Sequence, residues 1–266
     1  MTTTSQPATK PPGTAQRGFG TTLRIDRWSL EPMLTGGVFT AFIVYSLVSA
    51  LLLTPGVLGV EYESQGYISP FFSPLLLQGV LPWFFSPAIL ILWIPLGFRT
   101  TCYYYRKAYY RAFFFDPPGC AVGEIGIHRR YKMETAFPFI LQNLHRFFLY
   151  LAFVPLFFLW LDILFSLRFE DQWRIGLGTV ILGVNTFLLT MYSLSCHSMR
   201  HIVGGRLDCF SRTPVARTRY ALWKKFTGFN GRHARWAWAS LLSVAFTDLY
   251  IRLLAVGAIG DPAFRI

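Results

Sequence analysis

Residues 137–167 read FPFILQNLHRFFLYLAFVPLFFLWLDILFSL, and this stretch decides the fold. It contains only one Arg, Arg146, and one Asp, Asp162, with no Lys or Glu, and apolar residues, many of them aromatic, fill most of the rest. A bilayer core is about 30 Å thick, so about 20 apolar residues in a helix suffice to cross it. The stretch is longer than that and therefore predicts a membrane-spanning helix that is long or tilted.

Four more apolar runs occur along the chain of 266 residues, which is 53% hydrophobic and 14% charged. They cover residues 33–54, 75–98, 175–201 and 236–258. About 25% charged residues is usual in a soluble domain, so the composition excludes an ordinary soluble fold. We predict an all-α integral membrane bundle of five transmembrane helices in residues 31–266. A flexible cytoplasmic tail, rich in Pro, Gly and Thr, is expected in residues 1–30.

Basic residues are distributed unevenly between the apolar runs. Four lie in the tail, seven in residues 99–132 and eight in residues 206–235, whereas residues 55–78 contain none. Lys and Arg are retained on the cytoplasmic side of a membrane. We therefore expect a multi-pass protein of the cell (plasma) membrane, with the amino terminus inside and the carboxyl terminus outside. The net charge of +12 is then explained by basic loops that set the membrane topology and attract anionic lipid, and no nucleic-acid partner is expected.

All four cysteines and all five histidines fall on the predicted inner side. His197 and His201 are four residues apart and share one helix face, so both imidazoles can bind one metal. Cys102 and Cys120 flank an aromatic, basic segment that can bring them together as a loop. Two thiolates and two imidazoles suit zinc or a 2Fe–2S cluster of the Rieske type. Neither a CxxC pair nor a standard Rieske spacing is present, so helix-capping histidines and packing cysteines are the alternative.

Haem is a second interpretation of the histidines, since respiratory membrane anchors often hold haem between two helices. Four histidines could ligate one haem near the inner surface, namely His145, His197, His201 and His233. The predicted outer half has no histidine, which excludes a second haem there. A quinone headgroup needs hydrogen-bond donors and an apolar wall. The residue types for such a site lie at one predicted membrane level: His145, Arg146, His233 and Trp236.

Other classes of protein have less support. A transporter or channel needs a polar path through the midplane, and few such groups occur. Asp248 and Arg252 are four residues apart and are expected to pair, and Asn185 to form an interhelical hydrogen bond. A membrane metalloprotease needs a general base beside its metal, but the sequence has no HExxH motif. We assign no catalytic residue to this chain.

Five stretches together resemble the membrane-anchor subunit of succinate dehydrogenase, of the actinobacterial, cytochrome-b-like kind that lacks the full set of haem ligands. They are TCYYYRKAYYR (101–111), PPGCAV (117–122), LQNLHRFF (141–148), SCHSMRHIVGG (195–205) and GRHARWAWASL (231–241). The likeness covers roughly residues 95–249. Met199 departs from the pattern, since a cysteine is common at that position in the family.

The resemblance implies a function. Anchors of this kind bind a flavoprotein subunit and an iron–sulfur subunit at the inner face and pass electrons to menaquinone. A small additional membrane subunit is compatible with such a complex. At least one such anchor holds a Rieske-like 2Fe–2S cluster in its membrane region, so we expect that cluster on the cytoplasmic side, with haem b as the alternative. By resemblance the metal ligands come from Cys102, Cys120, Cys196, His197 and His201.

Overall fold

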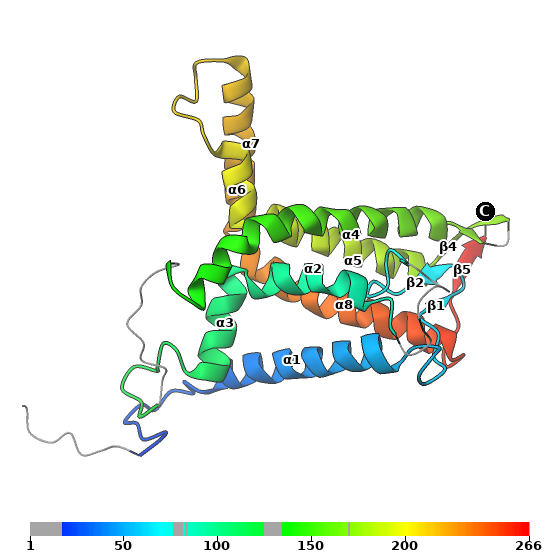
Figure 1. Cartoon of the computed structure of the whole chain (residues 1–266), viewed down its shortest axis with the longest axis horizontal. Coiled ribbons are helices and arrows are strands. Elements are labelled where there is room, and N and C mark those ends of the chain that lie inside the picture. Colours follow the sequence, from blue (N-terminus) through cyan, green and yellow to red (C-terminus); the bar gives the residue numbers. More distant parts are fainter. Residues whose placement is uncertain (1–17, 77–81, 83–84, 125–134, 170, 266) are drawn as a thin grey trace, which may run out of the picture.

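The computed structural model describes residues 18–76, 82, 85–124, 135–169 and 171–265. The described part of the chain contains the helices α1 (Leu30–Leu47), which continues as the π-helix η1 (Val48–Leu52), α2 (Ile89–Thr100), α4 (His145–Ser166), α5 (Leu177–Leu194) and α8 (His233–Ala255). These helices lie side by side along the long axis of the molecule (Figure 1). Among them, α5 packs against α4 and α8, and α2 packs against α4.

Four helical segments in the described part of the chain are long and apolar enough to cross a membrane. They are Leu30–Leu52, Phe139–Ser166, Leu177–Leu194 and His233–Ala255, where the 3₁₀ helix η3 (Phe139–Leu144) leads into α4. The second predicted span, residues 75–98, lies partly outside the described residues, and its described part contains the helix α2. Its 12 residues rise only about 18 Å. The helix begins at Ile89, two residues after Pro87, and the residue before a proline is disfavoured in the helical region.

The fourth predicted helix, residues 175–201, is wrong at its carboxyl end. The spanning helix α5 ends at Leu194, and a separate helix, α6 (His197–Gly204), begins after Cys196. Cys196 has an extended backbone with φ −62° and ψ 142°, which ends the run of helical residues. His197 and His201 therefore lie on α6 and not in the last turns of the membrane helix.

The two ends of the bundle differ in structure (Figure 1). At one end lie α3 (Tyr103–Phe114), α6 and α7 (Pro214–Asn230), and we call it the α3–α7 end. At the other, the strand end, short antiparallel strands pair as β1–β2 and β3–β4–β5. Their bounds are β1 (Glu63–Ser64), β2 (Tyr67–Ile68), β3 (Arg168–Phe169), β4 (Gln172–Gly176) and β5 (Ala263–Arg265). In register, Glu63 pairs with Ile68, Arg168 with Trp173 and Ile175 with Phe264.

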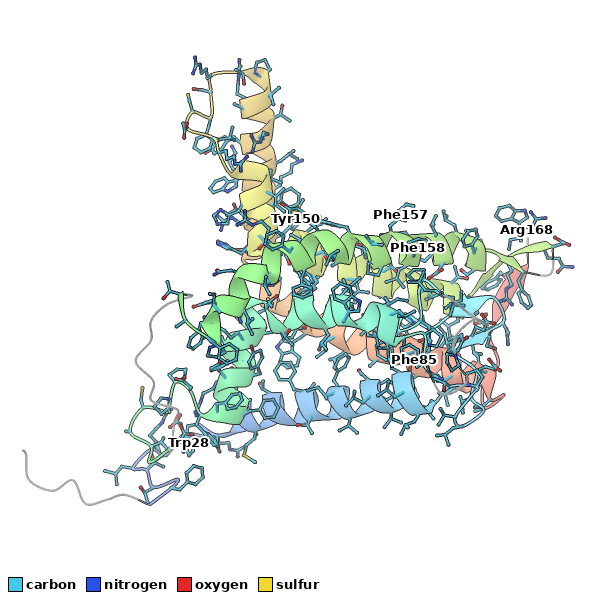
Figure 2. The ribbon with its side chains drawn as sticks, viewed as in Figure 1. Trp28, Phe85, Tyr150, Phe157, Phe158 and Arg168 are labelled. Carbon is cyan, nitrogen blue, oxygen red and sulfur yellow. The ribbon has the colours of Figure 1, made fainter. Side chains whose placement is uncertain are left out.

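Large apolar side chains cover the outside of the helices. Tyr150 and Phe157 on α4 are exposed and point away from the bundle (Figure 2). Buried positions between the helices include polar groups such as Asn185, Ser240 and Thr247. This inverted distribution suits a bundle surrounded by lipid. Ser243 on α8 donates to Asn185 on α5 at 2.8 Å, which confirms the predicted interhelical hydrogen bond.

Residues 18–24 of the predicted tail contact the loop that follows α3. Thr22 forms an isolated antiparallel bridge with Val122, and the Gly20 N–H donates to the Gly123 carbonyl at 2.7 Å. Arg24 donates to the Cys120 carbonyl at 3.2 Å. Residues 1–17 of the predicted tail lie outside the described residues.

Candidate functional site

Two buried cysteines mark the turns at the α3–α7 end. Cys102 lies between α2 and α3, and Cys196 lies between α5 and α6. Each is the residue before a helix and has an extended backbone, so the chain changes direction at both positions. Their side chains are 2% and 1% exposed and belong to one buried cluster.

Each cysteine contacts a histidine from another helix. The Cys102 Sγ lies 3.4 Å from the Nε2 of His233, the first residue of α8. The Cys196 Sγ lies 3.0 Å from the Nε2 of His145, the first residue of α4. The site thus consists of two thiol–imidazole pairs, which we call the Cys–His cluster: Cys102, His145, Cys196 and His233.

The other ring nitrogen of each histidine meets a hydroxyl group. His145 Nδ1 lies 3.1 Å from Thr101 Oγ1, and His233 Nδ1 lies 2.7 Å from Ser195 Oγ. Each hydroxyl belongs to the residue just before a cysteine of the cluster. A partner at Nδ1 fixes the ring orientation and directs Nε2 towards the thiol.

Aromatic rings enclose the two imidazoles. Phe98 stacks on His145 with ring centroids 4.8 Å apart, and Tyr192 stacks on His233 at 5.0 Å. Phe98 and Tyr192 contact each other edge to face at 5.2 Å. The Arg99 guanidinium lies 4.8 Å from the Tyr192 ring centroid, so a cation borders the cluster. These contacts pack both imidazole rings against aromatic side chains.

Burial affects the protonation of both thiols. It raises the pKa of the Cys196 thiol to about 11 and raises the pKa of Cys102 as well. Hydrogen bonds from the backbone N–H groups of Tyr105 and Tyr104 offset part of the rise at Cys102. Both side chains are therefore neutral thiols near pH 7 when nothing is bound. A coordinated metal would ionise them, because its charge replaces the proton.

The remaining predicted ligands lie elsewhere. Cys120 is exposed, and so are His197 and His201 on α6. The two histidines contact each other, with 2.9 Å between their Nε2 atoms. Within the described ranges, no three His, Cys, Asp or Glu side chains converge closely enough to hold a single metal ion. The structure therefore brings two of the expected metal ligands, Cys102 and Cys196, together with His145 and His233. From the sequence, these two histidines were expected at a quinone or haem site.

The other two predicted quinone residues are separate from the cluster. Arg146 is exposed on α4. Trp236 is half-buried against the cluster's apolar surroundings, with Phe187 at 6.5 Å between ring centroids. Its indole Nε1 has no hydrogen-bond partner among the residues that the structure describes.

A cavity of about 410 Å³ lies beside the Cys–His cluster, between α1, α2, α4 and α5. Most of its lining is apolar. Phe98 and Tyr192 line the cavity and also stack on the histidines of the Cys–His cluster, and Arg99 lies beside them. Ser46 also lines it. In the described part of the chain, neither the Ser46 Oγ nor the Tyr192 hydroxyl makes a hydrogen bond of standard geometry. Neither hydroxyl could be predicted from the sequence, because neither residue type stands out in an apolar run.

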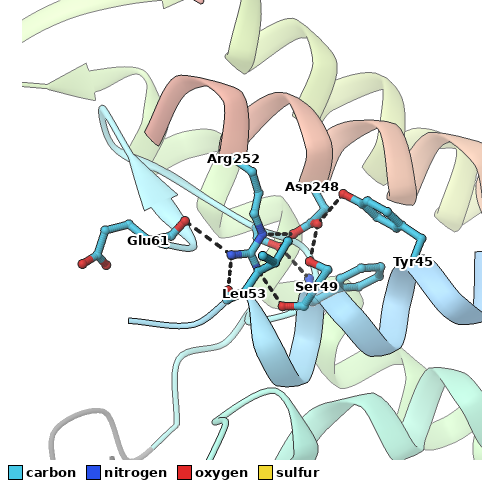
Figure 3. Close-up of polar contacts among 8 residues, drawn as sticks. Tyr45, Ser49, Leu53, Glu61, Asp248 and Arg252 are labelled. Atoms are coloured by element: carbon cyan, nitrogen blue, oxygen red, sulfur yellow. Dashed lines mark hydrogen bonds and ion pairs between the residues drawn. The ribbon is translucent and has the colours of Figure 1, made fainter. Parts of the chain in front are cut away.

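A second polar network is buried at the strand end (Figure 3). The carboxylate of Asp248 accepts hydrogen bonds from the hydroxyls of Tyr45 at 2.6 Å and Ser49 at 2.5 Å, and also from Ser69. It pairs with Arg252 at 3.4 Å, which confirms the predicted ion pair. The Arg252 guanidinium also donates to the backbone carbonyls of Ser49 and Leu53.

Together these features describe a multi-helix membrane protein with buried thiols and imidazoles at one end. The family model for the actinobacterial succinate dehydrogenase subunit SdhC matches residues 30–257, and the chain belongs to that family. A chain of the Mycobacterium smegmatis Sdh1 complex in the apo form is 39% identical, with a TM-score of 0.79. The match covers 96% of this chain and 98% of that one. No curated protein matches the sequence.

The resemblance found in the sequence is therefore confirmed. The chain is a membrane subunit of a succinate dehydrogenase complex, and other subunits of that complex are its partners. It is part of an oxidoreductase.

Proposed function

We propose that this subunit anchors the soluble flavoprotein and iron–sulfur subunits, holds a Rieske-like 2Fe–2S cluster, and binds menaquinone in the adjacent cavity. The observation that carries the proposal is the pair of contacts at Cys102–His233 and Cys196–His145. In this proposal the ligands are the four residues of the Cys–His cluster. This set keeps Cys102 and Cys196 from the ligands expected from the sequence. It has His145 and His233 in place of the other expected ligands, Cys120, His197 and His201.

The chemistry of the donor set supports this choice. A Rieske cluster takes two cysteine thiolates on one iron and two histidine nitrogens on the other. Here two buried thiols meet two Nε2 atoms whose rings are oriented by hydroxyls at Nδ1. When bound, such a cluster accepts and donates one electron, at a potential that imidazole ligation raises. Haem b has less support, because the Nε2 atoms of His145 and His233 face thiols at close range.

The cavity supports the quinone part of the proposal. Its volume lies within the range of about 300–1,000 Å³ that is usual for small-molecule sites. Among the residues that the structure describes, the hydroxyls of Ser46 and Tyr192 have no hydrogen-bond partner, so each can donate to a quinone carbonyl. The apolar walls suit the ring and an isoprenoid tail. Tyr192 also stacks on His233, so the cavity and the Cys–His cluster share a wall. We propose this cavity in place of a site at Arg146 and Trp236.

Docking of the soluble subunits is assigned to the basic surface of the α3–α7 end. We propose that this end faces the cytoplasm and that α2, with neighbouring residues, completes a fifth crossing. Residues expected to dock a partner include Arg106, Lys107 and Arg111. Lys107 is exposed, whereas Arg106 is buried over the Phe139 ring and Arg111 pairs with Glu124 at 2.8 Å. Docking therefore depends on Lys107 and other exposed basic residues.

The test uses the purified succinate dehydrogenase complex. Cys102→Ser and Cys196→Ser should each lower the iron and acid-labile sulfide by the content of one 2Fe–2S cluster and remove a Rieske-like EPR signal. Cys120→Ser, an exposed cysteine in the same chain, is the matched control and should leave the signal intact. A haem b absorbance with no such cluster in the wild-type complex would refute the assignment.

The quinone site is tested separately. Tyr192→Phe removes one hydroxyl and keeps the ring that stacks on His233. We expect this variant to retain the EPR signal and to oxidise succinate with a soluble dye, while its reduction of quinone falls. An equal fall of both activities would show a defect of assembly instead.

A further inference from the structure

The helices α6 and α7 form a hairpin, the α6–α7 arm, that projects sideways from the bundle (Figure 1). The arm stands across the direction of the spanning helices, at the end where α5 stops and α8 starts. Spanning helices run through the membrane from one surface to the other. An element that crosses their direction at their ends therefore runs along the membrane surface.

Specific contacts make the arm a defined unit. Arg219 of α7 donates to the carbonyls of Val203 at 2.9 Å and Gly205 at 2.7 Å, at the end of α6. Trp223 packs so tightly over Gly204 that a Cβ there would lie 2.3 Å from the ring. At its base the Asn230 side chain donates to the Ser195 carbonyl at 2.8 Å, which ties the arm to the bundle.

The exposed surface of α7 is divided into an apolar and a basic stripe. Val215, Leu222 and Phe229 are 69%, 41% and 36% exposed and follow one another at intervals of seven residues. Seven residues are close to two helical turns, so these side chains form one stripe. Arg217 and Lys224 are exposed at the same interval. They are offset by two residues, about 200° around the helix, and so lie nearly opposite the apolar stripe.

We propose that the α6–α7 arm lies in the headgroup region of an anionic phospholipid bilayer, with the stripe of Val215, Leu222 and Phe229 inserted among the acyl chains. A helix with Lys and Arg on one face and large apolar residues on the other is typical of such a position. Charge selects the lipid: α7 contains Arg217, Arg219, Lys224 and Lys225 but no Asp or Glu. Anionic headgroups attract basic side chains at this depth. The inference stands independently of the Cys–His cluster.

The experiment places a fluorescent label on each stripe in the intact complex. The exposed cysteines Cys120 and Cys209 are first replaced by serine, and an environment-sensitive dye is attached to Leu222→Cys or, as the matched control, Arg217→Cys. The complexes are placed in nanodiscs of phosphatidylglycerol and phosphatidylcholine. Lipids with a nitroxide near the headgroup report contact with the bilayer, and iodide reports contact with water.

The proposal expects several-fold stronger quenching of the Leu222 label by the nitroxide lipid than of the Arg217 label, and the reverse order with iodide. A Leu222 label quenched by iodide alone would overturn the proposal, because the stripe would face water. A label shielded from both quenchers would also overturn it, because a protein partner would cover the stripe. Phe229→Cys tests the same stripe if the first variant is poorly produced.

Lipid charge is tested by repeating the measurement in phosphatidylcholine alone. The proposal expects weaker nitroxide quenching at Leu222 in these neutral nanodiscs. Unchanged quenching would reject the preference for anionic lipid.

Discussion

Replacing Asp248 tests how the first and last membrane helices are held together. In the Asp248→Ala variant the hydroxyls of Tyr45, Ser49 and Ser69 lose their common acceptor. The guanidinium of Arg252, which is only 4% exposed, loses its counter-charge but keeps its backbone carbonyls. The variant therefore retains a buried cation without an anion.

The expected cost follows from that arrangement. Removing one partner of a buried ion pair typically costs about 3–5 kcal/mol, because the remaining charge stays in a medium of low polarity. Arg252→Met leaves the carboxylate unpaired instead and should cost a similar amount. The double variant removes both charges, so its loss should be smaller than the sum of the two single losses, by at least about 1 kcal/mol.

The free energy of unfolding is measured by titrating the purified chain in mixed micelles with a denaturing detergent and following helix content by circular dichroism. Asn185→Ala removes one hydrogen bond between α5 and α8 and serves as the reference. It should lower the free energy of unfolding by about 1 kcal/mol. Strictly additive losses at positions 248 and 252 would refute the reasoning, since they would show that the two charges do not depend on each other.

Two further predictions concern packing and pH. Gly97→Ala would place a Cβ 2.1 Å from the Phe148 ring where α2 meets α4, and should destabilise the chain by about 1–3 kcal/mol in the same unfolding assay. Gly183→Ala, with open space around it in α5, should instead stabilise by up to about 1 kcal/mol. Burial acts to raise the pKa of the Glu124 carboxyl, but hydrogen bonds from Arg111 and the Gly119 N–H outweigh it and lower the pKa. The contact of Glu124 with Arg111 and Gly119 is therefore complete above the unfolded pKa of about 4.5 and is lost as the pH falls through the lower folded pKa. Amide exchange of residues 18–24, which pair with this loop, should then accelerate in acid. Exchange rates that follow only the intrinsic pH dependence would contradict this prediction.

Hydropathy predicted much of the fold. Three of the five expected spans agree with the observed helices to within a few residues, because lipid requires long apolar helices. The break before α6 was missed, since SCHSMRH continues without Pro or Gly and has the residue types of a helix end. Only the backbone of Cys196 shows that the chain turns there.

The sequence predicted that the cysteines and histidines lie near one end of the bundle, but not which cysteine contacts which histidine. The sequence indicated that thiols and imidazoles gather at one end, and Cys102 and Cys196 were among the expected ligands. Their histidine partners are 131 and 51 residues away and lie on other helices. Hydropathy gives the depth of a residue in the membrane but not its rotation within the bundle, so the sequence could not show that each buried cysteine contacts a histidine of another helix.

The contacts of Asp248 and Arg252 bear on how the protein is made. Ser49 and Asp248 are 199 positions apart, and they join the first membrane helix to the last. Synthesis proceeds from the amino terminus, so α1 enters the membrane long before α8 exists. Until α8 arrives, Tyr45 and Ser49 lack their carboxylate acceptor and the carbonyls of Leu53 and Ser49 lack their guanidinium donor. A chain truncated before α8 therefore carries unmatched polar groups within lipid.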